Sequence, residues 1–162
     1  MSEQSPWSSP RRSQAGVVTL EYAFLLMIGI LPLLIFTFTG TLIFAAKQSL
    51  SLAAAEGSRA ALRHGNLQQR QANACIAARR SMQWLLNFSG QAPDCLSANS
   101  GSILISAALP CEDGGNVRCI RVTVSYDYDR YPFIPGTGTL FGWTVGQRLQ
   151  SQAVVQIDSA ML

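Results

Sequence analysis

The pattern of hydrophobic positions is dominated by one apolar run near the N-terminus, from Val17 to Ala46. No charged residue occurs between Glu21 and Lys47. As an α-helix that rises about 1.5 Å per residue, the run exceeds the roughly 30 Å hydrocarbon core of a bilayer. The apolar region of a secretory signal peptide is shorter, about 7 to 15 residues. We therefore predict a transmembrane helix over residues 17–46 that is retained in the protein.

The pattern stays helical beyond Lys47, where apolar and small residues recur every three or four positions. These residues are Leu50, Ala53, Ala54, Gly57 and Ala61. Such a face admits a second helix at close range, or it carries the protein's own sheet. We favour the sheet, because the domain after Lys47 must pack on the end of its helix. Gly65 suits the left-handed position after a helix, so Gly65-Asn66 indicates a helix end, and a second helix is expected over residues 67–87.

Strand signals fill the C-terminal part of the chain, after a loop expected over residues 89–100. A short apolar run over residues 102–109 is followed by Gly114-Gly115, which indicates a turn. The clearest alternation comes next, and it places four apolar side chains on one face: Ile120, Val122, Val124 and Tyr126. A last alternating strand is expected over residues 147–158.

Proline and glycine interrupt residues 131–146, which we expect to form a long loop. The loop is rich in aromatic residues: Tyr131, Phe133, Phe141 and Trp143. We interpret them as side chains that hold the loop on the domain, and an exposed contact surface is the alternative. In the second helix, Trp84 and Phe88 are expected to complete the apolar face, and a partner site is the alternative.

Together these elements predict an α+β fold. A long N-terminal membrane-spanning helix continues into a small domain with a second helix and a roughly three-stranded antiparallel sheet. The chain is divided into residues 1–16, 17–46 and 47–162. Arg11 and Arg12 lie just before the apolar run, whereas the flank beyond it is mixed in sign. The positive-inside rule therefore keeps the N-terminus in the cytoplasm and exports everything after Lys47.

All four cysteines lie in the segment that is expected to be exported: Cys75, Cys95, Cys111 and Cys119. An even number in a small domain outside the reducing cytoplasm predicts two disulfides, for which three connectivities exist. From their places along the chain we predict Cys111 with Cys119 across the turn, and Cys75 with Cys95 between the second helix and the loop after it. No pair has C-x-x-C spacing and the single histidine, His64, lies away from them, so no metal site is expected.

Composition argues against nucleic acid as a partner and against catalysis. The net charge of +3 is scattered, whereas nucleic-acid binding needs clustered Lys and Arg. His64 stands near a helix end with no nucleophile arrangement around it in the sequence. Gly136-Thr137-Gly138 is not followed by the Gly-Lys-Ser/Thr of a phosphate loop, and Asp127 and Asp129 lack the spaced ligands of a calcium loop. We therefore expect no catalytic residue, no cofactor and no enzymatic activity.

Two short motifs carry a resemblance to a known family. The first, Gly16-Val17-Val18-Thr19-Leu20-Glu21-Tyr22, resembles the Gly/x-x-x-x-Glu-Tyr processing site of the Flp branch of type IV pilins and of the TadE and TadF pseudopilins. The second, over residues 53–61, reads Ala-Ala-Ala-Glu-Gly-Ser-Arg-Ala-Ala and resembles the signature that follows the membrane helix in TadE-like proteins. TadE-like helices often carry a proline soon after the Glu-Tyr pair, whereas Pro32 comes later here.

The resemblance implies a minor pilin or pseudopilin that takes part in assembly of a Tad (Flp, type IVb) pilus for surface attachment. Gly16, Val17, Glu21 and Tyr22 would form the processing site, cut on the cytoplasmic side by a prepilin peptidase. Residues 1–16 would be a cytoplasmic leader, and residues 47–162 a periplasmic head anchored in the inner membrane by a single span. The implied partners are the prepilin peptidase, other pilins or pseudopilins and the Tad assembly platform.

Glu21 is the residue on which this mechanism depends. Cleavage would give Val17 an α-amino group. This group would be largely protonated at neutral pH, because such amines have a pKa of about 8. That cation would neutralise Glu21 within the subunit or across to the next one. The alternative is that Glu21 only reaches the cytoplasmic interface. Two other functions remain open: a minor pseudopilin of a type II secretion system, whose sites resemble Gly/Phe-Thr-Leu-x-Glu, and an uncleaved membrane-anchored periplasmic binding module or enzyme.

Overall fold

The computed structural model describes residues 15–95, 99–111, 117–138 and 148–158. The chain divides into two compact units, Met1–Phe38 and Thr39–Leu162. Several sequence predictions lie outside the described residues: the leader up to residue 14 with Arg11 and Arg12, the Gly114-Gly115 turn, and the aromatic residues Phe141 and Trp143. The rest shows the predicted α+β class, with one N-terminal helix that is long and apolar enough to span a membrane.

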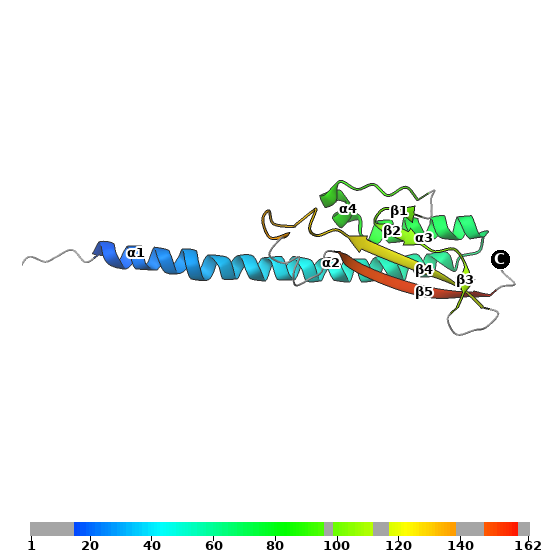
Figure 1. Cartoon of the computed structure of the whole chain (residues 1–162), viewed down its shortest axis with the longest axis horizontal. Coiled ribbons are helices and arrows are strands. Elements are labelled where there is room, and N and C mark those ends of the chain that lie inside the picture. The colour runs from blue at the N-terminus through cyan, green and yellow to red at the C-terminus, as the bar shows by residue number, and fades with distance from the viewer. Residues whose placement is uncertain (1–14, 96–98, 112–116, 139–147, 159–162) are drawn as a thin grey trace, which may run out of the picture. The chain divides into compact units, whose positions relative to one another are not determined.

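Helices come first along the chain and strands follow (Figure 1). The helical elements are α1 (Ala15–Leu25), the π-helix η1 (Leu26–Ile30), α2 (Leu31–Ala61), α3 (Leu67–Ser81) and α4 (Gln83–Ser89). The strands are β1 (Asn99–Ser100), β2 (Ile103–Ile105), β3 (Leu109–Pro110), β4 (Val117–Tyr126) and β5 (Leu149–Asp158).

Strand β4 is the centre of a single antiparallel sheet. All ten of its residues pair with β5, and Figure 1 shows β5 in red running beside β4 in yellow. Strands β2 and β3 lie one after the other along the opposite edge of β4, and β1 pairs with β2. Among the described residues the sheet has five strands rather than three, because the apolar run predicted as one strand over residues 102–109 contributes to both β2 and β3, and β1 forms in the expected loop.

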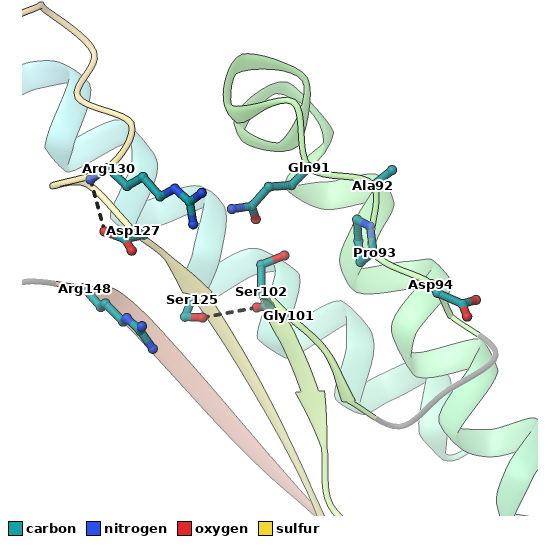
Figure 2. Close-up of a pocket in the computed structure, with 10 residues that line it drawn as sticks. All are labelled: Gln91, Ala92, Pro93, Asp94, Gly101, Ser102, Ser125, Asp127, Arg130 and Arg148. Carbon is teal, nitrogen blue, oxygen red and sulfur yellow. Dashed lines mark hydrogen bonds between the residues drawn. The ribbon is translucent and has the colours of Figure 1, made fainter.

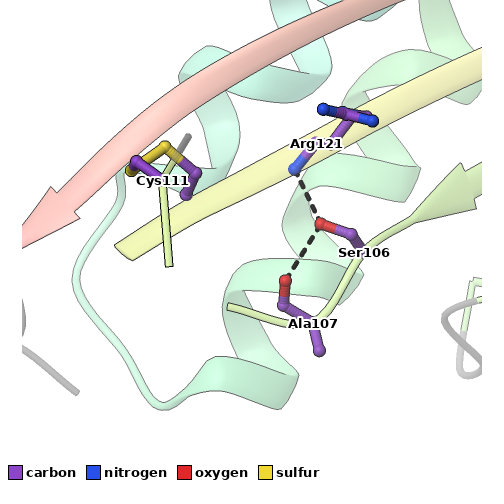
Figure 3. Close-up of a disulfide and its surroundings, with 5 residues drawn as sticks. Ser106, Ala107, Cys111 and Arg121 are labelled. Carbon is purple, nitrogen blue, oxygen red and sulfur yellow. Dashed lines mark hydrogen bonds between the residues drawn. A yellow bond between two sulfur atoms is a disulfide. The ribbon is translucent and has the colours of Figure 1, made fainter. Parts of the chain in front are cut away.

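Ser106 explains the division between β2 and β3 (Figure 3). Its backbone N–H donates to the Arg121 carbonyl at 2.9 Å, but its side-chain Oγ, not its carbonyl, accepts from the Arg121 N–H at 2.8 Å. The hydroxyl itself donates to the Ala107 carbonyl at 2.9 Å. The side chain thus replaces a ladder bond and satisfies the backbone while the chain leaves the regular strand path.

The alternation predicted for β4 is confirmed. Ile120, Val122 and Val124 are fully buried, whereas Arg121 on the other face is exposed. Helices cover the buried face: residues of α2, α3 and α4 belong to the same core cluster as β2, β4 and β5. The residues predicted to carry the sheet, Leu50, Ala53, Ala54, Gly57 and Ala61, are all buried. At Gly57 this face lies close to Val122 of β4 and also to Ala74 and Ala78 of α3, so it carries the sheet and admits a second helix as well.

The second helix is two helices, not one over residues 67–87. Helix α3 ends at Ser81, and Met82 takes φ −108° and ψ 18° before α4 begins at Gln83. No Gly or Pro marks this break in the sequence. The turn allows Met82, Leu85 and Leu86 all to be buried, and burial of three large apolar side chains outweighs one irregular residue.

The connection between α2 and α3 differs from the predicted helix end, in which Gly65 takes the left-handed helical conformation. Gly65 has φ +147°, which is a positive-φ but not a left-handed helical conformation. Asn66 is the N-cap of α3 and forms a capping box with Gln69. The buried Arg70 side chain donates from Nε to the Gly65 carbonyl at 2.9 Å and from Nη1 to the Ala61 carbonyl at 3.2 Å. A cation therefore binds the carbonyl end of α2, which the helix dipole favours.

An aromatic cluster closes one end of the core. The ring of Phe133 lies 5.6 Å from Tyr126, 5.5 Å from Tyr128, 5.9 Å from Trp84 and 5.4 Å from Phe88, centroid to centroid. The Tyr126 hydroxyl donates to the Tyr131 carbonyl at 2.8 Å. The described part of the loop is thus held down by aromatic contacts, as predicted, although Trp84 and Phe88 remain 41% and 52% exposed.

Both disulfides predicted from the sequence are present. Cys75 of α3 is bonded to Cys95 in the segment after α4, and Cys111 is bonded to Cys119 of β4. The separations along the chain are 20 and 8 residues. The second bond closes the β3–β4 connection, where the Cys111 N–H also donates to the Val117 carbonyl at 3.3 Å.

Removing the two disulfides should cost unequal stability. A chain-entropy estimate gives about 3 kcal/mol for closing the 20-residue loop and about 2.5 kcal/mol for the 8-residue loop. We therefore expect the Cys75→Ser/Cys95→Ser variant to lose more unfolding free energy in urea than the Cys111→Ser/Cys119→Ser variant. The opposite order would contradict this, and free thiols at all four wild-type positions in non-reducing peptide mapping would contradict the bonds themselves.

Stability should also fall in strong alkali because of Tyr126. Burial first, then the nearby Tyr128, Tyr131 and Asp127, raise the pKa of Tyr126 from 10.0 to about 12. The folded state therefore favours the neutral phenol, so this contribution is complete below about pH 10 and is lost as the pH rises toward about 12. Urea unfolding across this range should show a weaker pH dependence in Tyr126→Phe than in wild type. The exposed Tyr22→Phe serves as control, and an identical pH dependence in Tyr126→Phe and Tyr22→Phe would refute the assignment.

Candidate functional site

The residues predicted to form the processing site lie together on the first helix. Helix α1 begins at Ala15, and Gly16, Val17, Glu21 and Tyr22 are all exposed. Val17 and Glu21 are four residues apart, so they share one face of the helix and lie one turn from each other. Glu21 has no salt-bridge partner among the described residues. The arrangement therefore offers an unpaired carboxylate one turn from the position where a new N-terminus would appear.

The apolar segment exposed on all sides is shorter than the predicted span. Every residue from Gly16 to Phe38 is exposed, whereas Thr39, Ile43 and Ala46 are buried. The 22 residues from Val17 to Phe38 extend about 33 Å as a helix, close to the roughly 30 Å hydrocarbon core of a bilayer. Hydropathy alone does not separate the two stretches, because a face buried by tertiary packing is as apolar as one that contacts lipid.

A π-helix interrupts the apolar segment just before Pro32. The Leu31 N–H donates to the Leu26 carbonyl, five residues back. Proline lacks an N–H and its ring clashes with the carbonyl four residues earlier, so a wider turn before Pro32 relieves both problems. The apolar pattern alone does not indicate η1, although Pro32 is a signal for it.

The Thr37 hydroxyl forms its hydrogen bonds within its own helix. Its Oγ1 lies 2.7 Å from the Leu33 carbonyl and 3.0 Å from the Leu34 carbonyl of the same helix. A hydroxyl that bonds back to its own helix needs no solvent partner, which suits a helix placed in lipid.

The second motif, residues 53–61, combines a packing surface with an exposed ion pair. A Cβ added to Gly57 would lie 3.0 Å from Val122 Cγ1, 3.1 Å from the Ala74 carbonyl oxygen and 3.3 Å from Ala78 Cβ. At Gly57, α2 thus lies close to both α3 and β4. On the exposed side, Arg59 Nη1 lies 2.9 Å from Glu56 Oε1, a surface pair worth at most about 1 kcal/mol. The small residues of the motif therefore make the close contact with α3 and β4, whereas the charged pair lies on the surface.

No catalytic arrangement emerges from the described residues. His64 is exposed, and no group of three or more His, Cys, Asp or Glu in these residues could hold a metal ion. Asp127 instead closes a turn, because its Oδ1 accepts from the Arg130 N–H at 3.2 Å. Gly16, Val17, Glu21 and Tyr22, predicted as the processing site, form one group on α1, and the motif around Gly57 forms a separate structural one.

Comparison with known proteins adds no family to this picture. A scan against protein-family models and searches of curated proteins and of solved structures give no match to this chain.

A larger side chain at Gly57 should destabilise the head. Gly57→Val places methyl groups against Val122, Ala74 and Ala78, and such overpacking typically costs about 1 to 3 kcal/mol. The matched control is Ser51→Val, which puts the same side chain at an exposed position of α2. We expect the urea unfolding midpoint to fall for Gly57→Val and to stay near wild type for Ser51→Val. Equal midpoints for the two variants would show that the close contact at Gly57 does not limit stability.

Proposed function

We propose that this protein is a minor pilin or pseudopilin of the TadE type, which helps to assemble a Tad/Flp pilus after cleavage by a prepilin peptidase. In this proposal residues 1–16 are the leader, the apolar helix lies in the inner membrane, and the disulfide-bonded head lies in the periplasm. Support comes from the motif at residues 16–22 and from that at residues 53–61. It also comes from an exposed apolar helix joined to a small α+β head.

The observation that carries the proposal is the lone carboxylate in the exposed apolar helix. From Val17 to Phe38 the only charged residue is Glu21. A charge within a membrane segment costs about 2.5 to 3.5 kcal/mol at the centre and less near the end, so such residues are rare and mark function. Glu21 lies in the second turn of α1, on the same face as Val17. An amino group at Val17 is therefore a suitable partner.

Cleavage would supply the cation that Glu21 lacks, and the resulting ion pair could join two subunits. Before cleavage, Val17 has an amide and Glu21 has no cation on its face among the described residues. After cleavage, the Val17 ammonium pairs with Glu21 of the same subunit or of the next one. A pair in low dielectric needs good geometry to offset desolvation, so it fixes the axial position of one helix against another.

Glu21→Gln tests this mechanism, because it keeps the size and hydrogen bonding of the side chain but removes its charge. We expect the variant to be cleaved and inserted in the membrane, yet to co-purify with other pilus components at least about tenfold less than wild type, as for loss of a charged hydrogen bond. Phe24→Leu, a nearby exposed position that carries no charge, is the matched control and should behave as wild type.

Normal co-purification and pili in the Glu21→Gln strain would contradict the pairing. The result would instead favour a carboxylate that reaches the cytoplasmic interface, in a protein that is anchored by its helix and displays a periplasmic domain.

A further inference from the structure

A polar pocket of about 460 Å³ lies on the head, beside the end of β4 (Figure 2). It is lined by the segment after α4, by the turn between β1 and β2, and by residues that follow β4 and precede β5. Asp127 and Arg148 are the residues next beyond the last β4–β5 pair, Tyr126 with Leu149. The volume falls within the range of small-molecule sites, about 300 to 1,000 Å³.

Ser102 has a buried hydroxyl without a partner in this pocket. Gly101 and Ser102 form the two-residue turn between β1 and β2, and Gly101 has φ +65°, a conformation that favours glycine. Turn tips are normally exposed, but Ser102 is only 8% exposed. Its carbonyl accepts from the Ser125 N–H at 2.8 Å, whereas its Oγ has no hydrogen bond. In Figure 2 this hydroxyl points toward the Gln91–Pro93 segment, away from Ser125.

Two guanidinium groups flank the same space. Both line the pocket, and Figure 2 shows Arg130 above Ser125 of β4 and Arg148 to the left of it. In the part of the chain that the structure describes, neither arginine forms a salt bridge. The Arg130 guanidinium lies over the Tyr131 ring at 5.6 Å, which restrains it but leaves its N–H groups available. Planar guanidinium groups bind carboxylate oxygens in pairs of parallel hydrogen bonds.

The carboxylates in the pocket decide which anion fits. Asp94 already has an interaction partner, and Asp127 uses Oδ1 to accept from the Arg130 N–H. The remaining acceptor capacity of Asp127 repels a bare anion but binds a hydroxyl donor, as does the amide oxygen of Gln91. The orphaned hydroxyl of Ser102 suits the same kind of polar ligand, because a buried group without a partner is costly until something bonds to it.

We propose that this pocket binds a small organic acid that carries hydroxyl groups, such as a sugar acid. Its carboxylate lies between Arg130 and Arg148, and its hydroxyl groups bond to Asp127, Gln91 and Ser102. The inference does not depend on the pilin proposal, because none of its residues belongs to the processing site or to the motif at residues 53–61.

Saturation-transfer NMR on the full chain in detergent micelles tests the site with D-glucuronate as the probe. Acetate supplies the charge without hydroxyl groups, and D-glucose supplies hydroxyl groups without the charge. We expect a signal from glucuronate at millimolar concentration, and competition by neither acetate nor glucose at the same concentration. No glucuronate signal, or equal competition by acetate, would overturn the proposal.

Substitutions of the lining residues test whether glucuronate binds in this pocket. Arg148→Gln should weaken glucuronate binding about tenfold or more, as expected for loss of a charged hydrogen bond. The matched control is Arg63→Gln, at an exposed arginine outside the pocket, which should bind as wild type. Ser102→Ala should weaken binding without lowering the urea unfolding midpoint of the ligand-free protein, because it removes an unpaired buried hydroxyl. Equal binding by Arg148→Gln and Arg63→Gln, or unchanged binding by Ser102→Ala, would refute the site.

Discussion

The close approach of α2, α3 and β4 at Gly57 is the contact on which the head depends. With no side chain at this position, Val122 of the central strand and Ala74 and Ala78 of α3 reach the surface of α2. The neighbouring Ala53, Ala54 and Ala61 continue the same surface and are buried. Larger residues would push the sheet away from the helix and open cavities that the well-packed core does not tolerate. The two disulfides then join the outer segments to this framework.

Before Thr39 the side chains of the same long helix are exposed instead of packed in the core. From Val17 to Phe38 its side chains have no core to pack in, and the length of this stretch is that of a lipid bilayer's hydrocarbon core. A single carboxylate near its start is costly in lipid unless a cation neutralises it. The proposed cleavage before Val17 supplies that cation, so the cost of Glu21 becomes a reason for subunits to associate. The function we propose rests on this balance of charge.

Sequence predicted the features that depend on local pattern. The uninterrupted apolarity after Glu21 was enough for the long helix, and the alternation from Ile120 was enough for β4. The break at Met82 was missed because no Gly or Pro marks it and the burial of Leu85 and Leu86 decides it. The division of residues 102–109 was missed because the Ser106 hydroxyl replaces a ladder bond, a contact 15 residues along the chain. The pocket brings together four segments of the chain, at residues 91–94, 101–102, 125–130 and 148, so no local pattern indicates it.

Mass spectrometry of the N-terminus, on protein taken from a membrane that contains the prepilin peptidase, tests the central claim most directly. We predict a mature chain that begins at Val17, because a basic segment, a small residue and an exposed apolar helix meet at Gly16. A protein that begins at Met1, with the peptidase present and active on another substrate, would contradict it.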